Sequence, residues 1–322
     1  MALSVGIDIG GTSTKLALVT EDGVIMGRKV LITQGINDEK TYFKSLFEQI
    51  RALGQSINGK GPLRGIGIGA PACNGRTGTI EYAANLPFGG ERVEIVNILE
   101  AELGLPTFLI NDSNAAAVGE KKYGGAQQFD SFILLTLGTG LGCGIMLENK
   151  IITGKNGWAG ELGHVNVTPN GRACGCGRRG CLETYVSATG IKRTAFALLA
   201  EERDDSLLRQ YNYEEMTAMR IYDAAVQKDP LALKAFELTG NILGQKLAEI
   251  GTTLEPEAIF LAGGLAEAGP LLFEPTEKSL NNHILNTLKN KIPVLASKLG
   301  TNDAALLGAA SLVWEYQKVK MS

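Results

Sequence analysis

The stretch from Val5 to Val19, VGIDIGGTSTKLALV, consists of an alternating apolar strand, a turn with two glycines and a second alternating strand. A similar unit returns at residues 132–147, FILLTLGTGLGCGIML, with its turn at Gly138-Thr139-Gly140. A hairpin turn follows each unit, at residues 21–23 and at residues 148–150. The repeat predicts an internal duplication: two similar α/β lobes around a central cleft, each bringing backbone N–H groups to one bound molecule.

Apolar residues at helical spacing between residues 39 and 53 predict an amphipathic helix that covers the first sheet. Further helices are expected at about 183–202, 216–228, 230–251, 271–290 and 304–317. Short strands are expected at 24–30, 65–69, 107–110, 258–261 and 293–295. The chain has no low-complexity linker, so we expect a hinge near residues 111–114 rather than a tether.

The composition excludes several classes of protein. The chain has 322 residues, a formal net charge of -3 and no Lys/Arg cluster, so nucleic acid is not an expected partner. Its apolar runs are shorter than the roughly 18 residues of a membrane-spanning helix, and the N-terminus has no secretion signal pattern. We therefore expect a cytoplasmic protein without a membrane partner. Five cysteines, three of them within eight positions, favour a metal site over a disulfide framework.

The segment from Asp8 to Lys15 places an acid at the end of a strand, then two glycines, hydroxyl side chains and a cation. Such a loop can hold phosphates through backbone N–H groups, and the Asp8 carboxylate can hold Mg²⁺ directly or through water. The segment lacks the spacing of a Walker loop. A plain glycine hairpin is the alternative interpretation, and the matching turn at residues 138–142 favours phosphate binding.

The segment Asn111-Asp112-Ser113-Asn114 follows a strand and opens an alanine-rich helix. One of these side chains is expected to cap the helix. A carboxylate at this junction can also accept the proton of an attacking hydroxyl group, as the base of a kinase does. Both interpretations of Asp112 stay open on the residues alone. With only two histidines, His164 and His283, the chain does not favour a Ser-His-Asp hydrolase.

The most specific local pattern is His164 followed by Cys174, Cys176 and Cys181. Three thiolates and one imidazole form a closed tetrahedral set that is typical of structural zinc, although free thiols in a glycine loop are the alternative. Arg172, Arg178 and Arg179 are expected to favour the thiolate form. Glu161 and Glu183 would then lie on one braced element, where fixed carboxylates suit the vicinal hydroxyls of a polyol; solvated surface acids are the alternative.

Taken together, these motifs resemble the ROK family, within the superfamily of sugar kinases, actin and heat-shock ATPases. The resemblance extends over nearly the whole chain. It implies a two-lobed actin-like ATPase (ribonuclease H-like) fold, with a small lobe of residues 1–112 plus a C-terminal helix, 303–322. Residues 113–302 would form a large lobe that carries the zinc motif and the oligomer interface of a homodimer or homotetramer.

The resemblance also implies roles for individual residues. Asp112 would be the catalytic base, and His164 would serve zinc with one ring nitrogen and the sugar with the other. The sugar-binding residues would be Asn85, Asn111, Asp112, Glu161, His164 and Glu183. The nucleotide and its Mg²⁺ would be held by Asp8, Gly10, Gly11, Thr12, Lys15, Gly138, Thr139, Gly263 and Gly264. Zinc would be held by His164, Cys174, Cys176 and Cys181.

The implied reaction is transfer of a phosphoryl group from ATP to the 6-hydroxyl of a hexose, with glucose as the closest family substrate. Phe88-Gly89-Gly90-Glu91 stands where related glucokinases usually carry a Trp, which weakens the assignment of glucose. Fructose, mannose and N-acetylated hexosamines such as N-acetylmannosamine and N-acetylglucosamine stay open. Polyphosphate in place of ATP also stays open as the phosphoryl donor. The rivals are a sugar-responsive regulator, a sugar-binding protein without catalysis, and an ATPase that moves domains. Seven residues precede Asp8, so we expect no helix-turn-helix for a regulator.

Overall fold

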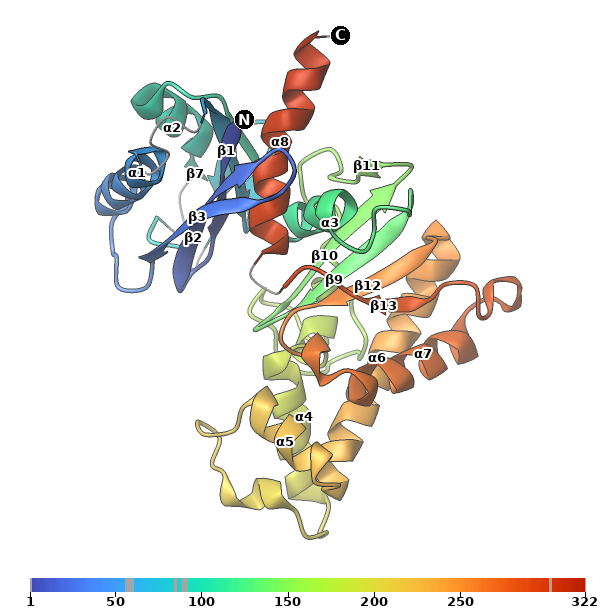
Figure 1. The fold of residues 1–322 in the computed structure, drawn as a ribbon. Coiled ribbons are helices and arrows are strands. Elements are labelled where there is room, and N and C mark those ends of the chain that lie inside the picture. Colours follow the sequence, from blue (N-terminus) through green and yellow to red (C-terminus); the bar gives the residue numbers. More distant parts are fainter. Residues whose placement is uncertain (1, 56–60, 84–85, 89–91, 301–302, 322) are drawn as a thin grey trace. The chain divides into compact units, whose positions relative to one another are not determined.

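The computed structural model describes residues 2–55, 61–83, 86–88, 92–300 and 303–321, with the backbone alone for 316–321. Figure 1 shows the fold as a ribbon coloured along the chain from the N-terminus to the C-terminus. The helices are α1 Glu39–Gln55, α2 Ile95–Leu103, α3 Asp112–Tyr123, α4 Ala188–Glu201, α5 Ala218–Val226, α6 Pro230–Leu254, α7 Pro270–His283 and α8 Ala304–Met321. The strands are β1 Leu3–Ile9, β2 Ser13–Thr20, β3 Ile25–Ile32, β4 Leu63–Ala70, β5 Cys73–Asn74, β6 Thr79–Glu81, β7 Arg92–Val93, β8 Thr107–Asn111, β9 Phe132–Leu137, β10 Leu141–Leu147, β11 Lys150–Ile151, β12 Ala258–Ala262 and β13 Val294–Ala296.

Two five-stranded sheets have the same topology. The first has the order β3-β2-β1-β4-β8 and the second the order β11-β10-β9-β12-β13. In both sheets the first three strands in the chain form a meander at one edge, and the last two strands pair in parallel, as β4 with β8 and β12 with β13. This repeated order is what the duplication of the strand-turn-strand unit predicted.

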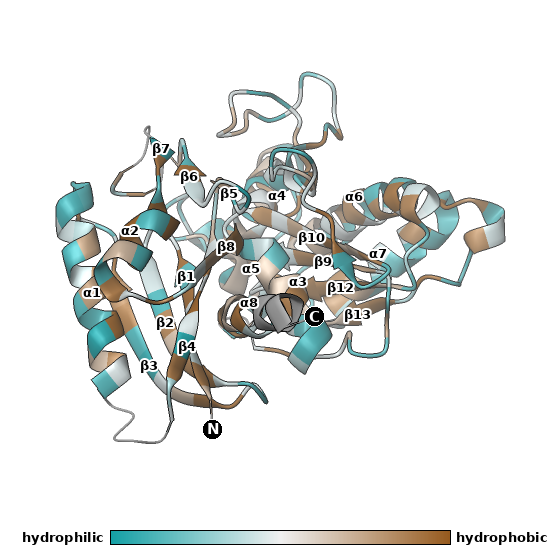
Figure 2. Cartoon of the chain, turned by 90° about the horizontal axis from the view of Figure 1, so that it is seen from above, coloured by the Kyte–Doolittle hydropathy of each residue, from teal (hydrophilic) through white to brown (hydrophobic). Residues whose placement is uncertain are grey.

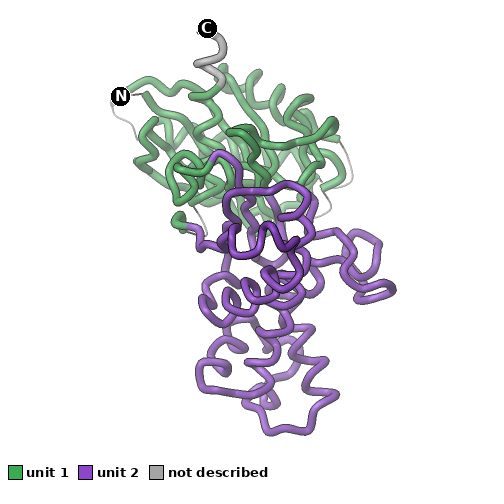
Figure 3. The backbone as a smooth tube through the Cα atoms, turned by 90° about the vertical axis from the view of Figure 1, so that its right-hand side faces the viewer, with its two compact units in different colours: residues 1–129, 144–160, 298–322 green, residues 130–143, 161–297 purple. Residues whose placement is uncertain are grey.

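By its contacts the chain divides into two compact units, shown in Figure 3. The first unit comprises residues 1–129, 144–160 and 298–322, and the second comprises residues 130–143 and 161–297. The lobe boundaries and the oligomer interface expected from the sequence stay a prediction. Among the helices that the structure describes, none combines the length and the apolar character that a membrane-spanning segment needs.

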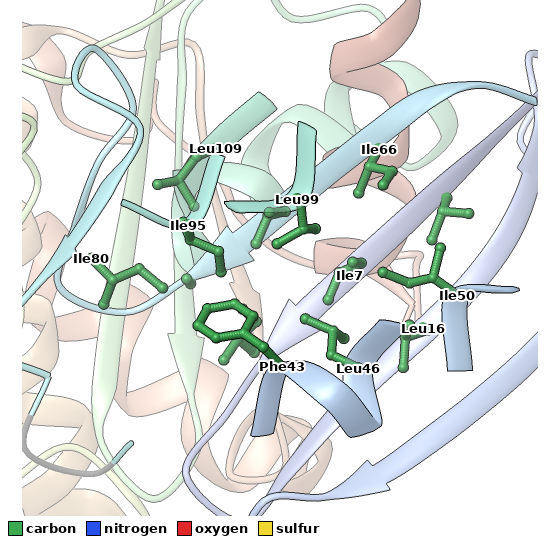
Figure 4. Close-up of a cluster of buried hydrophobic side chains, with 14 of the residues drawn as sticks. Ile7, Leu16, Phe43, Leu46, Ile50, Ile66, Ile80, Ile95, Leu99 and Leu109 are labelled. Atoms are coloured by element: carbon green, nitrogen blue, oxygen red, sulfur yellow. The ribbon is translucent and has the colours of Figure 1, made fainter. Parts of the chain in front are cut away.

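The core of the first unit lies between the first sheet and α1. Phe43, Leu46, Ile50 and Leu53 of α1 are buried, as the helical spacing predicted. Figure 4 shows three of them beside Ile7 and other side chains of the sheet. Figure 2 shows that α1 carries both hydrophobic and hydrophilic residues along its turns. Such an amphipathic helix is stabilised mainly by burying its apolar face.

Helix α8 packs on β1, β2 and β4 of the first sheet and on α3. Glycines allow this close approach, because a Cβ atom on Gly6 would lie 2.2 Å from the carbonyl oxygen of Leu306. A Cβ atom on Gly67 would lie 1.8 Å from the carbonyl oxygen of Ala309. The end of the chain therefore contributes to the same unit as its beginning.

In the second unit, β12 lies between β9 and β13 and pairs with both in parallel. Helices α6 and α7 pack closely at Gly244, where a Cβ atom would lie 2.4 Å from the carbonyl oxygen of Thr276. Two helices, α4 and α7, are shorter than the sequence predicted. Helix α4 begins at residue 188 because Ser187 caps it, its Oγ accepting the N–H of Gly190 at 2.9 Å. Helix α7 ends at residue 283, and the chain then forms a separate short turn at residues 286–288.

Candidate active site

The turn between β1 and β2 carries the first group of predicted site residues. Asp8 pairs with Lys15 across the two antiparallel strands. The N–H of Gly10 donates to the carbonyl oxygen of Ser13 at 3.1 Å, which closes the turn. The Thr12 side chain is exposed, while its carbonyl oxygen accepts two N–H groups from the segment after β3. The turn is thus fixed from both sides, with Gly10, Gly11 and Thr12 at its tip.

Asp112 is the first residue of α3, directly after β8. The cap of this helix is Asn111, whose Oδ1 accepts the N–H groups of Ser113 at 2.9 Å and Asn114 at 3.2 Å. The Oδ1 of Asp112 also accepts the N–H of Ser113, at 2.7 Å. Helix capping was one of the two roles left open for Asp112. Because Asn111 is the cap, capping does not account for the acid at position 112.

Within the first unit, the charge of Asp112 acts on the carboxyl group of Asp8. Burial, followed by the charge of Asp112, raises the pKa of Asp8 to about 6, while Lys15 opposes the shift. Burial also raises the pKa of Asp112, and hydrogen bonds from Ser113 partly offset this. Two neighbouring carboxylates on half-buried residues make a divalent cation favourable, because it would relieve their repulsion. This charge pattern fits the predicted Mg²⁺ at Asp8.

The second unit brings together the Cys/His cluster, which comprises His164, Cys174, Cys176 and Cys181. One ligand atom from each lies within 4.8 Å of all the others. The Sγ atoms of Cys176 and Cys181 are 3.7 Å apart, and the Sγ of Cys174 is 3.6 Å from Nδ1 of His164. Zinc–sulfur bonds of about 2.3 Å in a tetrahedron separate the ligand atoms by about 3.8 Å, so the cluster fits zinc. Nδ1 is the histidine nitrogen that faces it.

The arginines of this region have different roles. Arg178 hydrogen-bonds the carbonyl oxygen of His164. Burial raises the pKa of the Cys176 thiol, but hydrogen bonds, first from the backbone of Arg178, bring it to about 7. Arg172 was expected to favour thiolates, and that expectation is wrong: its guanidinium donates to Thr184, Gly190 and Thr194. Arg179 donates to the carbonyl oxygen of Asn170 instead.

Glu183 connects the Cys/His cluster to the turn Gly138-Thr139-Gly140. Its Oε2 accepts the N–H of Leu141 at 3.1 Å, and its Oε1 lies 3.7 Å from the Sγ of Cys174. A Cβ atom on Gly140 would lie 2.4 Å from the same Oε2. Glu161 is exposed, and its carbonyl oxygen accepts the N–H of His164 at 3.1 Å. Both glutamates therefore lie on the element that the cluster would brace.

The start of α4 is tied to the same turn. The N–H of Ala188 donates to the carbonyl oxygen of Gly138 at 2.8 Å, and the Thr189 hydroxyl donates to that of Thr139 at 2.9 Å. The N-terminus of a helix attracts phosphate groups. Neither Ala188 nor Thr189 was among the predicted site residues. The signal that could have identified them is Ser187-Ala188-Thr189, a pattern typical of the start of a helix and therefore of a place where phosphate groups can bind.

Gly263 and Gly264 follow β12, and Gly263 packs against the end of β9, the strand that leads into the turn at residues 138–140. Gly263 has a φ of +91°, and a Cβ atom on it would lie 2.6 Å from the carbonyl oxygen of Leu137. Beside Gly264 is a cavity of about 150 Å³. Its other walls come from Ala218, Met219, Tyr222, Phe236, Leu265, Glu267 and Ala268. A largely apolar cavity with an aromatic wall suits a flat heterocyclic base.

The structure thus groups the predicted residues by unit. Asp8, Gly10, Gly11, Thr12, Lys15, Asn111 and Asp112 belong to the first unit, and Gly138, Thr139, Glu161, His164, Glu183, Gly263, Gly264 and the three clustered cysteines belong to the second. Asn85 lies outside the described residues. Phe88, noted as a departure from related glucokinases, is buried against Tyr42 and Phe43 in the core of the first unit.

The repeated sheet, the paired glycine turns and the Cys/His cluster define an actin-like sugar kinase fold. The model of the ROK family matches residues 4–316, so the chain belongs to this family. It is 35% identical over 313 residues to a glucokinase from Halalkalibacterium halodurans, covering 96% of this chain and 94% of the relative.

Two solved structures illustrate the range of the family. One is a ROK family glucokinase from Streptomyces griseus in complex with glucose and AMPPNP, with a TM-score of 0.81, 32% identity, and coverage of 97% of this chain and 99% of that one. The other is a ROK family transcriptional regulator, a homolog of the E. coli MLC protein, with a TM-score of 0.87 and 26% identity. This second match covers 98% of this chain and 78% of the regulator.

Proposed function

We propose that the chain is an ATP-dependent hexose kinase that phosphorylates the 6-hydroxyl of glucose. The observation that carries the proposal is the half-buried Asp112 at the first residue of α3, whose charge acts on Asp8 and which is not needed as the helix cap because Asn111 serves as the cap. Similarity over nearly the full length to relatives named glucokinase supports the same activity.

In this proposal Asp112 accepts the proton of the sugar hydroxyl, since burial moves its pKa upward, toward the working pH of a general base. Asp8 would hold Mg²⁺, which when bound neutralises charge on the transferring phosphoryl group. Gly10, Gly11 and Thr12 in the first unit and the turn at residues 138–140 in the second would offer N–H groups to the phosphates of ATP, and Gly263-Gly264 would lie against adenosine.

The sugar would be bound by Asn85, Asn111, Asp112, Glu161, His164 and Glu183. Because Nδ1 of His164 faces the thiols, Nε2 is the nitrogen that we assign to the sugar. Zinc held by the Cys/His cluster would have four protein ligands and no open position, so it would brace the loop and take no part in the chemistry. Assembly as a homodimer or homotetramer is part of the proposal.

Replacement of Asp112 tests the proposal. Asp112→Ala should leave glucose binding, measured by calorimetry, largely intact and lower turnover by about 10²- to 10⁴-fold, the usual contribution of a general base. Asp38→Ala, which removes an exposed acid at the start of α1, is the matched control. Unchanged turnover in Asp112→Ala would end the assignment of the base.

A panel of sugars tests the substrate. We expect a coupled assay with ATP and Mg²⁺ to give the highest kcat/KM with glucose among glucose, fructose, mannose, N-acetylmannosamine and N-acetylglucosamine. A higher value for another sugar would replace glucose and leave the kinase assignment in place.

A sugar-responsive regulator is the second candidate, favoured by the TM-score of 0.87 with a family regulator. Release of ADP separates the candidates, because a kinase produces ADP only in proportion to the sugar phosphorylated. Sugar binding without any ADP release would favour the regulator, and ADP release that is indifferent to sugar would favour an ATPase.

A further inference from the structure

Three buried hydroxyl side chains lie at the base of the turn between β1 and β2. The hydroxyl oxygen of Thr14 is 2.9 Å from that of Tyr42 and 3.0 Å from that of Thr33. All three residues are at most 1% exposed. Thr14 is the second residue of β2, Thr33 directly follows β3, and Tyr42 lies in the first turn of α1. One network of hydroxyl groups therefore joins three elements of the first unit.

The ring of Tyr42 is fixed by its packing. Its centroid lies 5.5 Å from that of Phe43 and 5.3 Å from that of Phe88, and both pairs are edge to face. Burial raises the pKa of Tyr42, so the phenol keeps its proton and can donate it in a hydrogen bond. A hydroxyl group on a packed ring restricts the position of Thr14 more than an apolar contact would, because a hydrogen bond depends on direction.

The same network extends to the tip of the turn through Thr33. The carbonyl oxygen of Thr12 accepts the N–H of Thr33 at 3.0 Å and that of Gln34 at 3.1 Å. At the base of the turn, Thr14 pairs with Ile9 of β1. The hydroxyl group of Thr14 therefore holds the base of the turn, and the backbone of Thr33 holds its tip.

Packing alone does not require these hydroxyl groups. Valine has the shape of threonine, and phenylalanine has nearly that of tyrosine. Replacing both partners of a buried hydrogen bond by apolar groups of the same shape costs little stability. A buried network whose members are all hydrogen-bonded instead specifies one arrangement of the segments that it joins. The hydroxyl groups thus add a directed connection between α1 and the turn.

We propose that Tyr42, Thr14 and Thr33 are positioning residues, which hold the turn at residues 10–12 in the arrangement that receives the phosphates of ATP. This positioning role rests on the proposed function, which assigns the turn to the phosphates. None of the three side chains needs to touch the nucleotide.

Tyr42→Phe tests the role, because it removes the hydroxyl group and keeps the ring. Binding of ATP must then restore the position of the turn, at a cost of up to one hydrogen bond. We expect KM for ATP, and the Kd of AMPPNP with Mg²⁺ measured by calorimetry, to rise by about three- to ten-fold. KM for glucose should not change. Thr33→Val removes the hydroxyl group at the other end of the network and should act in the same direction.

Tyr123→Phe is the matched control. The hydroxyl group of Tyr123 donates to the carbonyl oxygen of Glu21 at 3.0 Å, in the hairpin turn at the other end of β2. This variant also removes one hydrogen bond from the first sheet, so urea unfolding should show a loss of stability. Its KM for ATP and its Kd for AMPPNP should equal those of the wild type.

Unchanged values for ATP and AMPPNP in both Tyr42→Phe and Thr33→Val would overturn the positioning role. An equal rise in Tyr123→Phe would also overturn it, because the network would then only support the fold. Circular dichroism establishes that the variants are folded. A wild type that binds AMPPNP but forms no ADP with any sugar would end the proposed function, and the Kd of AMPPNP in the variants would still decide the positioning role. A wild type that does not bind AMPPNP would overturn both.

Discussion

The backbone N–H of Leu141 donates a hydrogen bond of 3.1 Å to Oε2 of Glu183. Oε1 of the same carboxylate lies 3.7 Å from the Sγ of Cys174, a member of the Cys/His cluster. One side chain therefore connects the cluster to the glycine turn at residues 138–140. Glu183, expected from the sequence to bind sugar, is also in position to hold the turn that we assign to the phosphates.

Glu183→Ala should raise KM for ATP as well as KM for the sugar, because the turn loses the acceptor for the N–H of Leu141. We expect an increase of about ten-fold for ATP, equivalent to about 1.4 kcal/mol. Glu183→Gln should raise KM for ATP less, since its amide oxygen can still accept this hydrogen bond. Steady-state kinetics with each substrate varied in turn measures both effects.

The control for this prediction is Glu277→Ala, which removes an exposed acid on α7. Its KM for ATP should equal that of the wild type. An unchanged KM for ATP in Glu183→Ala would mean that Glu183 serves only the sugar.

The spacing of apolar residues predicted the structure correctly where the local pattern and the burial of side chains agree. The apolar spacing in α1 identified Phe43, Leu46 and Ile50 as buried, and the two strand-turn-strand units gave sheets of identical strand order. The pattern could not identify Asn111 as the cap of α3, because Asn111 and Asp112 are both good capping residues. Only the hydrogen bonds from Ser113 and Asn114 distinguish them.

Long-range contacts account for what the sequence did not show. Arg172 is near the cysteines in the chain, and so its charge was assigned to them. Its guanidinium reaches Gly190 and Thr194, about 20 positions along the chain, which no local pattern encodes. A cavity beside α3 likewise takes its lining from four separate stretches of the chain, within residues 73–76, 109–121, 146–157 and 312–315, and their approach follows from packing and not from any motif.

The coupling of Asp8 and Asp112 predicts a measurable titration. Burial and the charge of Asp112 raise the pKa of Asp8 to about 6. In Asp112→Asn the pKa of Asp8 should fall, because the repelling charge is gone. It should stay above its ordinary value of 3.8, because burial is the larger cause. Carbon NMR of the Asp8 carboxyl group across a pH series measures the shift, and a pKa equal to that of the wild type would contradict the coupling.

The raised pKa of Asp8 also predicts how its contribution to stability depends on pH. The folded chain binds this proton more tightly than the unfolded chain, so protonation favours folding. The contribution of Asp8 is therefore fully present below pH 3.8 and is lost as the pH rises to about 6. Urea unfolding of Asp8→Asn and of the wild type, measured at pH values between 3.8 and 6, isolates the contribution of Asp8 to the free energy of unfolding. A difference between the two proteins that does not change with pH would contradict it.

The Cys/His cluster predicts one zinc per chain after purification without chelators. Bound zinc would stabilise the folded state by about 3 kcal/mol when free zinc exceeds its dissociation constant about a hundredfold. Cys181→Ser should lose the metal and unfold at lower temperature. Cys143→Ala, at a buried cysteine outside the cluster, should keep the metal. Metal analysis and thermal unfolding measure these effects, and a wild-type protein with far less than one zinc would remove the bracing role.

Arg172 is predicted to position the nucleotide turn through α4. Its guanidinium donates to the carbonyl oxygens of Thr184 and Gly190 at 2.8 and 3.1 Å, and to Thr194. It also lies 4.3 Å from the ring centroid of Tyr185. Arg172→Lys cannot reproduce this planar fork, so we expect the free energy of unfolding to fall by about 1–3 kcal/mol.

The positioning role of Arg172 gives a second readout beyond stability. Because Ala188 at the start of α4 donates to the carbonyl oxygen of Gly138, displacement of this helix should raise KM for ATP more than it lowers kcat. Arg179→Lys, at an exposed arginine nearby, should change neither quantity. Urea unfolding and ATP kinetics on both variants provide the measurement. A loss of stability in Arg172→Lys with KM for ATP unchanged would show that Arg172 only supports the fold, because a shifted turn could not leave the nucleotide unaffected.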